Sequence, residues 1–297
     1  MESHSKYDAK GLATKHTLSQ DWDRRWELWD AEGLPSLDEL RVWFEPAELI
    51  RIGEMAGELS DRLERCRAAQ AVSDWLLEPG DWEEALDRRA VLHALEQASG
   101  LDRFALAWAG MPAPPPWLRP RPLRPLELGV LVRHAAGNPL RRALVGVALT
   151  GAGTGELKQL TPASVRDTGE IELPGVARHV LPRVRPIEDW ARRAVQELAR
   201  DAKLRRGSGG PLLVNSRLEA GSEKVQSALC MHIRNLLRRD VIGDDPTLQP
   251  NSLRATAGRR VYDREGLEAA GWALGVADHR WSDLRAEIGL VAPGASR

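Results

Sequence analysis

The 297-residue chain has only two cysteines, Cys66 and Cys230. Two thiols do not make a disulfide framework, and no Cys and His stand at the spacing of a metal site. No apolar run approaches the roughly 20 residues that a membrane span requires, and the polar N-terminus has no apolar core like that of a signal peptide. We therefore expect a cytoplasmic protein that holds no metal or other cofactor and does not enter a membrane.

The chain also has almost no excess of either charge, since its net charge is −1, but the charge is distributed unevenly between its two halves. Residues 1–110 contain 13 Lys and Arg against 23 Asp and Glu, whereas residues 111–297 contain 29 against 20. A basic half is what a surface for a polyanion requires, and most of the basic residues are Arg, which suits planar contacts to phosphate and base edges. Two solvated surfaces of opposite sign are the alternative.

The first hundred residues are expected to be helical. Residues 1–20 are polar and aperiodic and predict a flexible arm, and residues 21–110 predict a bundle of four or five helices. Trp22, Trp26 and Trp29 recur at i, i+4 and i+7, on one face of a helix. Aromatic residues at that spacing favour a core or a helix–helix seam, and a face that binds a partner or stacks on DNA is the alternative.

A proline-rich stretch separates the two halves. Residues 111–124 predict a stiff, extended linker that carries Arg119 and Arg121. Residues 125–297 predict a second domain that is mainly α-helical, with a small strand–turn–strand element over residues 170–182. Its later helices are expected at about 186–203, 222–240, 253–265 and 266–275, followed by a tail.

The chain is organised around residues 250–261, which predict a helix capped by Asn251 or Ser252. This helix places Arg254 in its first turn, where the helix dipole already supplies partial positive charge. A bound anion such as phosphate would resolve the conflict. A nearby carboxylate paired with a partly exposed Arg254 is the alternative.

Three short motifs resemble those of the tyrosine recombinases (the phage integrase family). Asn251-Ser-Leu-Arg254-Ala-Thr is similar to the family's H-x-L-R-H-T, and Leu274-Gly275-Val276 stands in the place of L-G-H. Thr150-Gly-Ala-Gly153-Thr-Gly-Glu156-Leu157 is similar to T-G-x-R-x-x-E-L, about a hundred residues upstream. The resemblance implies a helical N-terminal domain like the family's core-binding domain, although this one is acidic. It also implies a C-terminal domain with the integrase catalytic-domain fold.

The family's chemistry uses a tyrosine nucleophile, two arginines, His or Trp donors and a lysine around the scissile phosphate. Arg254 keeps its arginine here, but no lysine lies between Lys158 and Lys203, and Tyr7 and Tyr262 are the only tyrosines. The positions at which the chain departs from the family pattern are Gly153, Asn251, Val276 and Arg285. Because covalent catalysis has no first step without a nucleophile, we expect no catalytic residues and a protein that is not an enzyme.

The resulting hypothesis is a catalytically inactive protein that binds double-stranded DNA sequence-specifically. We expect it to act as a transcriptional repressor of the phage-immunity type, at an operator in the nucleoid of a bacterial host. The alternatives are a non-catalytic partner of an active recombinase at recombination-like sites, with self-association or partner binding through the acidic domain, and an active recombinase with an unrecognised nucleophile. The candidate DNA contacts are Arg254, Asn251, Ser252, Arg259, Arg260, Lys158, Arg178, Arg183, Lys224, Arg234, Arg119 and Arg121.

Overall fold

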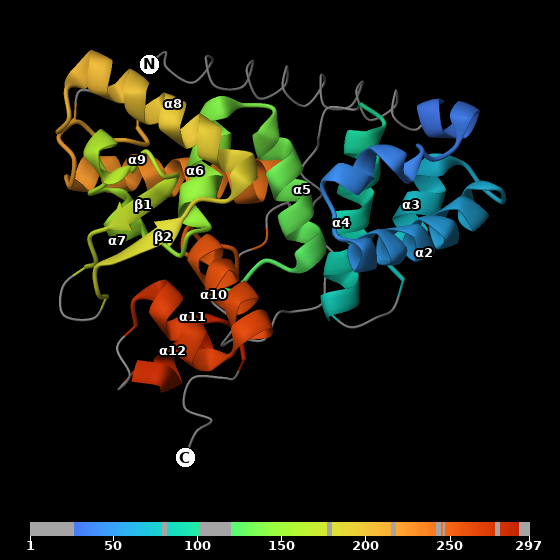
Figure 1. Ribbon diagram of the computed structural model, residues 1–297. Helices are drawn as coiled ribbons and strands as arrows, with labels where there is room; N and C mark the ends of the chain where they lie inside the picture. Colours follow the sequence, from blue (N-terminus) through green and yellow to red (C-terminus); the bar gives the residue numbers. More distant parts are fainter. Residues whose placement is uncertain are drawn as a thin grey trace, which may run out of the picture. The chain divides into compact units, whose positions relative to one another are not determined.

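The computed structural model forms two compact units, Met1–Pro112 and Ala113–Arg297. Both are built mainly from helices, and the described part of the chain contains one antiparallel sheet of two strands (Figure 1). The expected fold class, mainly α with a small antiparallel β element, is confirmed. The structure describes residues 27–78, 82–100, 120–176, 180–214, 218–241, 245, 247–276 and 280–290. The predicted arm, Trp22, Trp26, Arg119, Arg178 and most of the linker lie outside these residues.

The first unit is a small helical bundle. Its elements are a helical segment at residues 27–32, a 3-10 helix η1 (Leu37–Val42), α2 (Pro46–Leu63), α3 (Ala68–Leu76) and α4 (Trp82–Ala98). The Trp29 side chain is buried, and its indole Nε1 donates a hydrogen bond to Ser99 Oγ (3.0 Å). Trp29 is therefore a core residue, as its helical spacing indicates.

The second unit is centred on two closely packed helices, α6 (Pro139–Ala148) and α8 (Asp189–Arg206). A Cβ atom placed on Gly146 of α6 would lie only 2.2 Å from Ala191 Cβ of α8. Only a residue without a side chain permits this approach. The neighbouring elements are α5 (Pro125–Ala136), α7 (Thr154–Leu157) and a 3-10 turn η2 (Pro162–Ser164).

The small sheet pairs β1 (Glu170–Leu173) with β2 (Arg183–Pro186), Glu170 opposite Pro186 and Leu173 opposite Arg183. The predicted strand–turn–strand element exists, but its second strand begins beyond residue 182. Val176 and Val180 instead form an isolated bridge within the connection, so the turn is longer than the local sequence pattern indicated.

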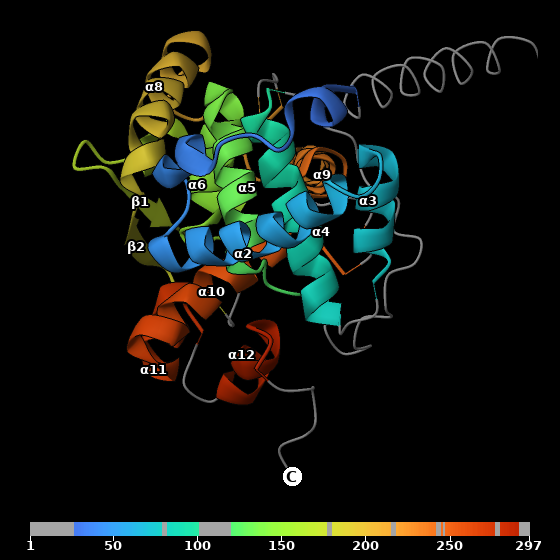
Figure 2. The same cartoon turned by 90° about the vertical axis from the view of Figure 1, so that its right-hand side faces the viewer.

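The C-terminal part contains α9 (Glu223–Arg234), a π-helix η4 (Asn235–Val241), α10 (Ser252–Glu265), α11 (Leu267–Leu274) and α12 (Trp281–Glu287). The expected single helix over 222–240 is thus an α-helix that continues as a π-helix. The expected tail is wrong in part, because α12 is helical. Figures 1 and 2 show α10, α11 and α12 gathered at one end of the unit, around a common core that includes Val261, Leu274 and Ile288.

Among the described residues, no helix combines the length and the apolar character needed to cross a membrane.

Candidate functional site

The three motifs meet at the side chain of Arg254, in the first turn of α10. Its Nη1 donates to the carbonyl oxygen of Gly151 (2.7 Å), in the first motif, and its Nη2 donates to that of Leu274 (2.9 Å), in the third. Gly151 precedes Arg254 by 103 residues. Segments that are far apart in the sequence therefore form one site, in which Arg254 is only 5% exposed.

Glu156 is the buried anion of this site. Its side chain is 1% exposed, and its two oxygens accept hydrogen bonds from Arg183 (Nη1–Oε1 2.7 Å, Nη2–Oε2 3.1 Å). Glu156 Oε2 also lies 3.5 Å from Nη1 of Arg254 and accepts from the backbone N–H of Gly153 (3.0 Å). One carboxylate therefore holds two guanidinium groups and the turn that leads into α7.

Arg183, the first residue of β2, completes the inner part of the site. It donates to the carbonyl oxygens of Ala273 (2.8 Å) and Gly151 (2.8 Å) as well as to Glu156. Burial lowers the pKa of Arg183 below its ordinary value, and the hydrogen bonds and negative charge of Glu156 oppose that effect. Arginine nevertheless keeps its proton at ordinary pH, so Arg183 acts as a structural cation.

A second carboxylate, Glu287 at the end of α12, closes the outer side of the site. Its Oε1 lies 2.6 Å from Nε of Arg254, and its side chain is 28% exposed. We use the name Arg254 cluster for Glu156, Arg183, Arg254 and Glu287. The two cations and two anions cancel, so the structure shows an Arg254 that is satisfied by carboxylates, the second of the two interpretations that the sequence left open.

The departures from the family pattern surround this cluster. A Cβ atom on Gly153 would lie 3.5 Å from Arg254 Cδ, so the position assigned to the family's first arginine is beside its second. Asn251 is exposed, and its Oδ1 accepts from the N–H of Thr154 (3.3 Å) instead of capping α10. Val276 is half-buried against the C-terminal core, and Arg285 is exposed on α12.

Tyr262, the one tyrosine within the described residues, lies on α10. It is half-buried and packs against the same C-terminal core, and the Arg259 guanidinium lies 6.0 Å from its ring centroid. Tyr7 lies outside the described residues. No third tyrosine exists in the sequence.

Three of the predicted DNA contacts are buried: Arg254, described above, and Arg121 and Ser252, for which the expectation that they reach DNA is corrected. Arg121 is 1% exposed and bridges two buried carboxylates, Glu127 (2.7 and 2.6 Å) and Asp245 (2.8 and 2.7 Å). Ser252 is fully buried, and its hydroxyl accepts from the N–H of Gln249 (3.0 Å). Arg121 therefore fastens the end of the linker to the second unit, and neither side chain is available to a ligand.

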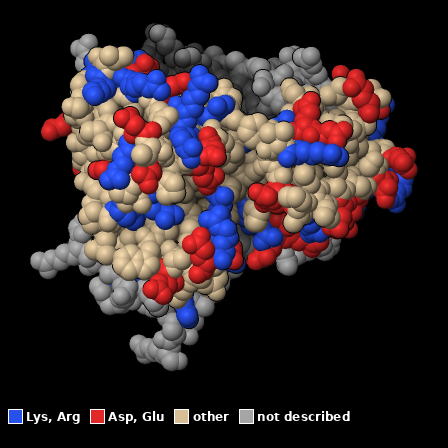
Figure 3. All heavy atoms as spheres, viewed as in Figure 1, with Lys and Arg blue, Asp and Glu red and all other residues tan. Residues whose placement is uncertain are grey.

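The other described candidates are nearer the surface. Lys224 and Arg234, both on α9, are exposed. Three more pair with carboxylates: Arg259 with Asp263 (2.9 Å), Arg260 with Glu188 (2.5 Å), and Lys158 with Glu223. On the face drawn in Figure 3, basic and acidic side chains lie side by side. Surface ion pairs of this kind contribute little to stability, so their arginines and lysines exchange partners at little cost.

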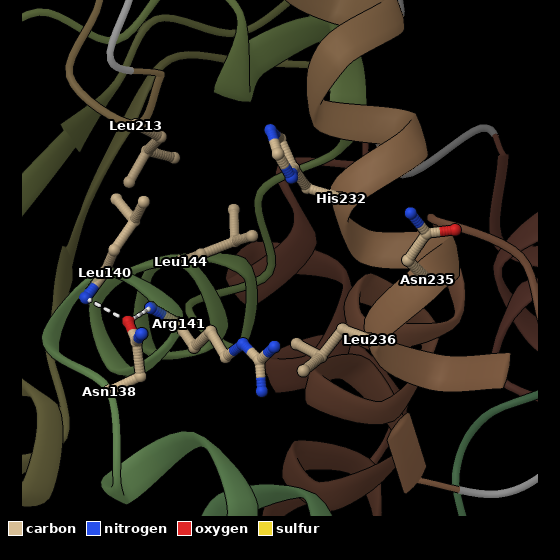
Figure 4. A pocket seen from close by; sticks show the side chains of 8 residues that line it. All are labelled: Asn138, Leu140, Arg141, Leu144, Leu213, His232, Asn235 and Leu236. Carbon is tan, nitrogen blue, oxygen red and sulfur yellow. Dashed lines mark hydrogen bonds between the residues drawn. The ribbon is translucent and has the colours of Figure 1, made fainter. Parts of the chain in front are cut away.

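A separate pocket lies between the start of α6 and the junction of α9 with the π-helix (Figure 4). Its volume is about 460 Å³, and it is lined by Asn138, Leu140, Arg141, Leu144, Leu213, His232, Asn235 and Leu236. Asn138 is occupied in capping α6, since its Oδ1 accepts from the N–H groups of Leu140 and Arg141. The pocket shares no residue with the Arg254 cluster, so it is not the site that the motifs form.

No group of His, Cys, Asp and Glu that would hold a metal ion occurs among the residues that the structure describes.

No protein-family model matches the chain, and no curated protein matches it. Its fold is similar to that of XerA recombinase, at 16% identity and a TM-score of 0.48, over 82% of this chain and 86% of that one. It is similar to a lambda integrase tetramer bound to a Holliday junction (18% identity, TM-score 0.38, 92% and 78% coverage). It is also similar to the Tn1549 transposon integrase in complex with transposon right end DNA (13% identity, TM-score 0.41, 81% and 89% coverage).

These are proteins of the kind that the three motifs indicated. They also correct one expectation, that the chain is not an enzyme. The solved structures to which it is similar are a recombinase and two integrases.

Proposed function

We propose that this chain binds double-stranded DNA at specific sites, on a scaffold like that of the tyrosine recombinases. We further propose a regulatory role of the repressor type, at an operator of a phage or mobile element in a bacterial cell. The observation that carries the proposal is the convergence of the three motifs on Arg254, which donates to Gly151 O in the first and Leu274 O in the third. If the three short motifs resembled the family only by chance, there would be no reason for them to meet at one side chain.

Charge supports the same proposal. The half of the sequence that contains the cluster has 29 Lys and Arg against 20 Asp and Glu. Lys224 and Arg234 are exposed on α9, and they are able to contact phosphates without first breaking a buried ion pair. Phosphate contacts of this kind give most of the non-specific affinity and position a protein on the duplex, while base edges provide specificity.

A mobility-shift experiment tests the proposal with the purified full-length chain. The DNA consists of fragments from around its own gene and a pool of randomised duplexes that is sequenced after repeated binding. We expect one sequence motif to be enriched, with affinity that falls steeply as salt rises. Failure to enrich any motif, with equal affinity for every fragment, would overturn the proposal.

Matched variants connect binding to the second unit. Lys224→Ala should weaken binding to all duplexes by a similar factor and reduce the salt slope by about 1. Lys203→Ala, an exposed lysine on α8 that is outside the candidate contacts, is the control and should change neither. Equal effects of the two variants would argue against a binding surface that includes α9.

The same reactions distinguish repression from strand exchange. Denaturing electrophoresis after incubation detects covalent protein–DNA adducts and rearranged strands, which would assign recombinase activity. A reporter gene that carries the enriched motif between promoter and start codon measures repression. Binding that requires an added recombinase would favour an accessory role instead.

A further inference from the structure

Glu287 differs from every other partner of Arg254. The remaining partners are the carbonyl oxygens of Gly151 and Leu274 and the carboxylate of Glu156, which is 1% exposed. Glu287 is 28% exposed and approaches the Nε edge of the guanidinium, at 2.6 Å. It is therefore the one partner of Arg254 among the described residues that combines a negative charge with contact to solvent.

The element that carries Glu287 is small. Helix α12 runs only from Trp281 to Glu287 and is followed by a short turn with Ile288 in the C-terminal core. The carbonyl partners belong to the α6–α7 turn and to the end of α11, both built into the core of the unit. If the Glu287 side chain moves away, Nε of Arg254 is exposed to another ligand, while the hydrogen bonds from Arg254 to the carbonyl oxygens of Gly151 and Leu274 are kept.

Carboxylate and phosphate are alternative ligands of the same chemical class for arginine. Both present two oxygens that match the guanidinium fork, and both form short, charge-assisted hydrogen bonds with it. Because Glu287 is only partly buried, at 28% exposed, its pairing with Arg254 adds less to stability than that of a fully buried carboxylate, and its exchange for another anion has a small cost. The position of Glu287 is the one that a phosphate oxygen would take at the Nε edge.

We propose that Glu287 is a built-in competitor for a phosphate of the DNA backbone at Arg254, and so sets the affinity of the site. This competition rests on the proposed function. In free protein the cluster is electrically neutral, because Glu156 and Glu287 balance Arg183 and Arg254. When duplex binds, a backbone phosphate replaces the Glu287 carboxylate at Arg254, and the released carboxylate turns to solvent.

The test compares Glu287→Gln with Glu268→Gln in the full-length chain. Both variants remove one negative charge from the same unit, but Glu268 is exposed on α11 and is not a partner of Arg254, so it controls for net charge. With the duplex enriched from the random pool, Glu287→Gln should bind about three- to tenfold more tightly than the control. Its salt slope should stay close to that of the control, because the same backbone phosphate contacts Arg254 in both bound proteins.

Inorganic phosphate provides a second readout that does not depend on DNA. Phosphate should raise the melting temperature of Glu287→Gln more than that of the wild type or the Glu268→Gln control, because a ligand that binds only the folded state stabilises it. If the wild type binds no duplex, the proposed function fails, and the phosphate shift alone still decides whether Glu287 competes for Arg254.

Equal behaviour of the two Gln variants in both readouts would overturn the competition. Should Glu287→Gln not fold, Glu287→Asp keeps the charge but shortens the side chain by one methylene. It should then show a phosphate shift larger than that of the wild type, and a shift equal to the wild type's would contradict the competition.

Discussion

Arg254 is expected to contribute strongly to the stability of the second unit, and its replacement by Ala would show how much the cluster contributes. The substitution removes donors to Glu287, Gly151 O and Leu274 O from a site in which the arginine is 5% exposed. Arg183 still serves Glu156 and Gly151 O, so these two keep a partner. Leu274 O loses its side-chain donor, and a cavity replaces the side chain.

Breaking a buried ion pair by removing one partner typically costs about 3–5 kcal/mol. For a unit of this size, each kcal/mol lowers the melting temperature by about 2–4 °C, so Arg254→Ala should melt about 6–20 °C below the wild type. Glu287→Ala should cost about 1 kcal/mol or less, because that carboxylate is partly exposed.

Thermal denaturation followed by circular dichroism measures both variants and the double variant. The two single effects should differ severalfold, and their coupling should be no larger than the small effect of Glu287→Ala. A melting temperature for Arg254→Ala within about 2 °C of the wild type would refute the structural role that the hydrogen bonds assign to this arginine.

Three other substitutions probe separate features. Arg121→Met leaves the Glu127 and Asp245 carboxylates buried without their cation. It should lower the free energy of unfolding by about 3–5 kcal/mol, and a melting temperature like the wild type's would contradict this. Gly146→Ala forces a Cβ against Ala191 at 2.2 Å and should cost about 1–3 kcal/mol in denaturant unfolding, whereas a neutral result would show that α6 and α8 separate freely. Gly153→Arg has room for its Cβ and a negative φ of −78°, so it should fold normally and steepen the salt slope of DNA binding by about 0.9; an unchanged slope would argue that this position does not face DNA.

The sequence predicted those features that depend on local periodicity and on motif order. Helix α10 begins at Ser252 and ends at Glu265, close to the expected 253–265, because Pro250 marks its start. Trp29 is buried, as aromatic spacing on a helix face indicates. The fold class followed from the alternation of helical segments with one short β element.

The partners of the charged residues were not predictable from local sequence. Asp245, which binds Arg121, lies 124 residues away in the chain, and Glu287 lies 33 residues beyond Arg254. No local pattern encodes either pairing. Helix α12 was missed because its seven residues are too few to show a helical period, and Ser252 resembled an exposed cap although its hydroxyl is buried.

Affinity for the selected duplex and for a scrambled duplex of the same composition, measured by fluorescence anisotropy over a salt series, tests sequence-specific DNA binding most directly. We predict that the selected duplex binds at least about 10³-fold more tightly near physiological salt, and that both affinities fall as salt rises. Equal affinities for the two duplexes at every salt concentration would contradict sequence-specific DNA binding by this chain.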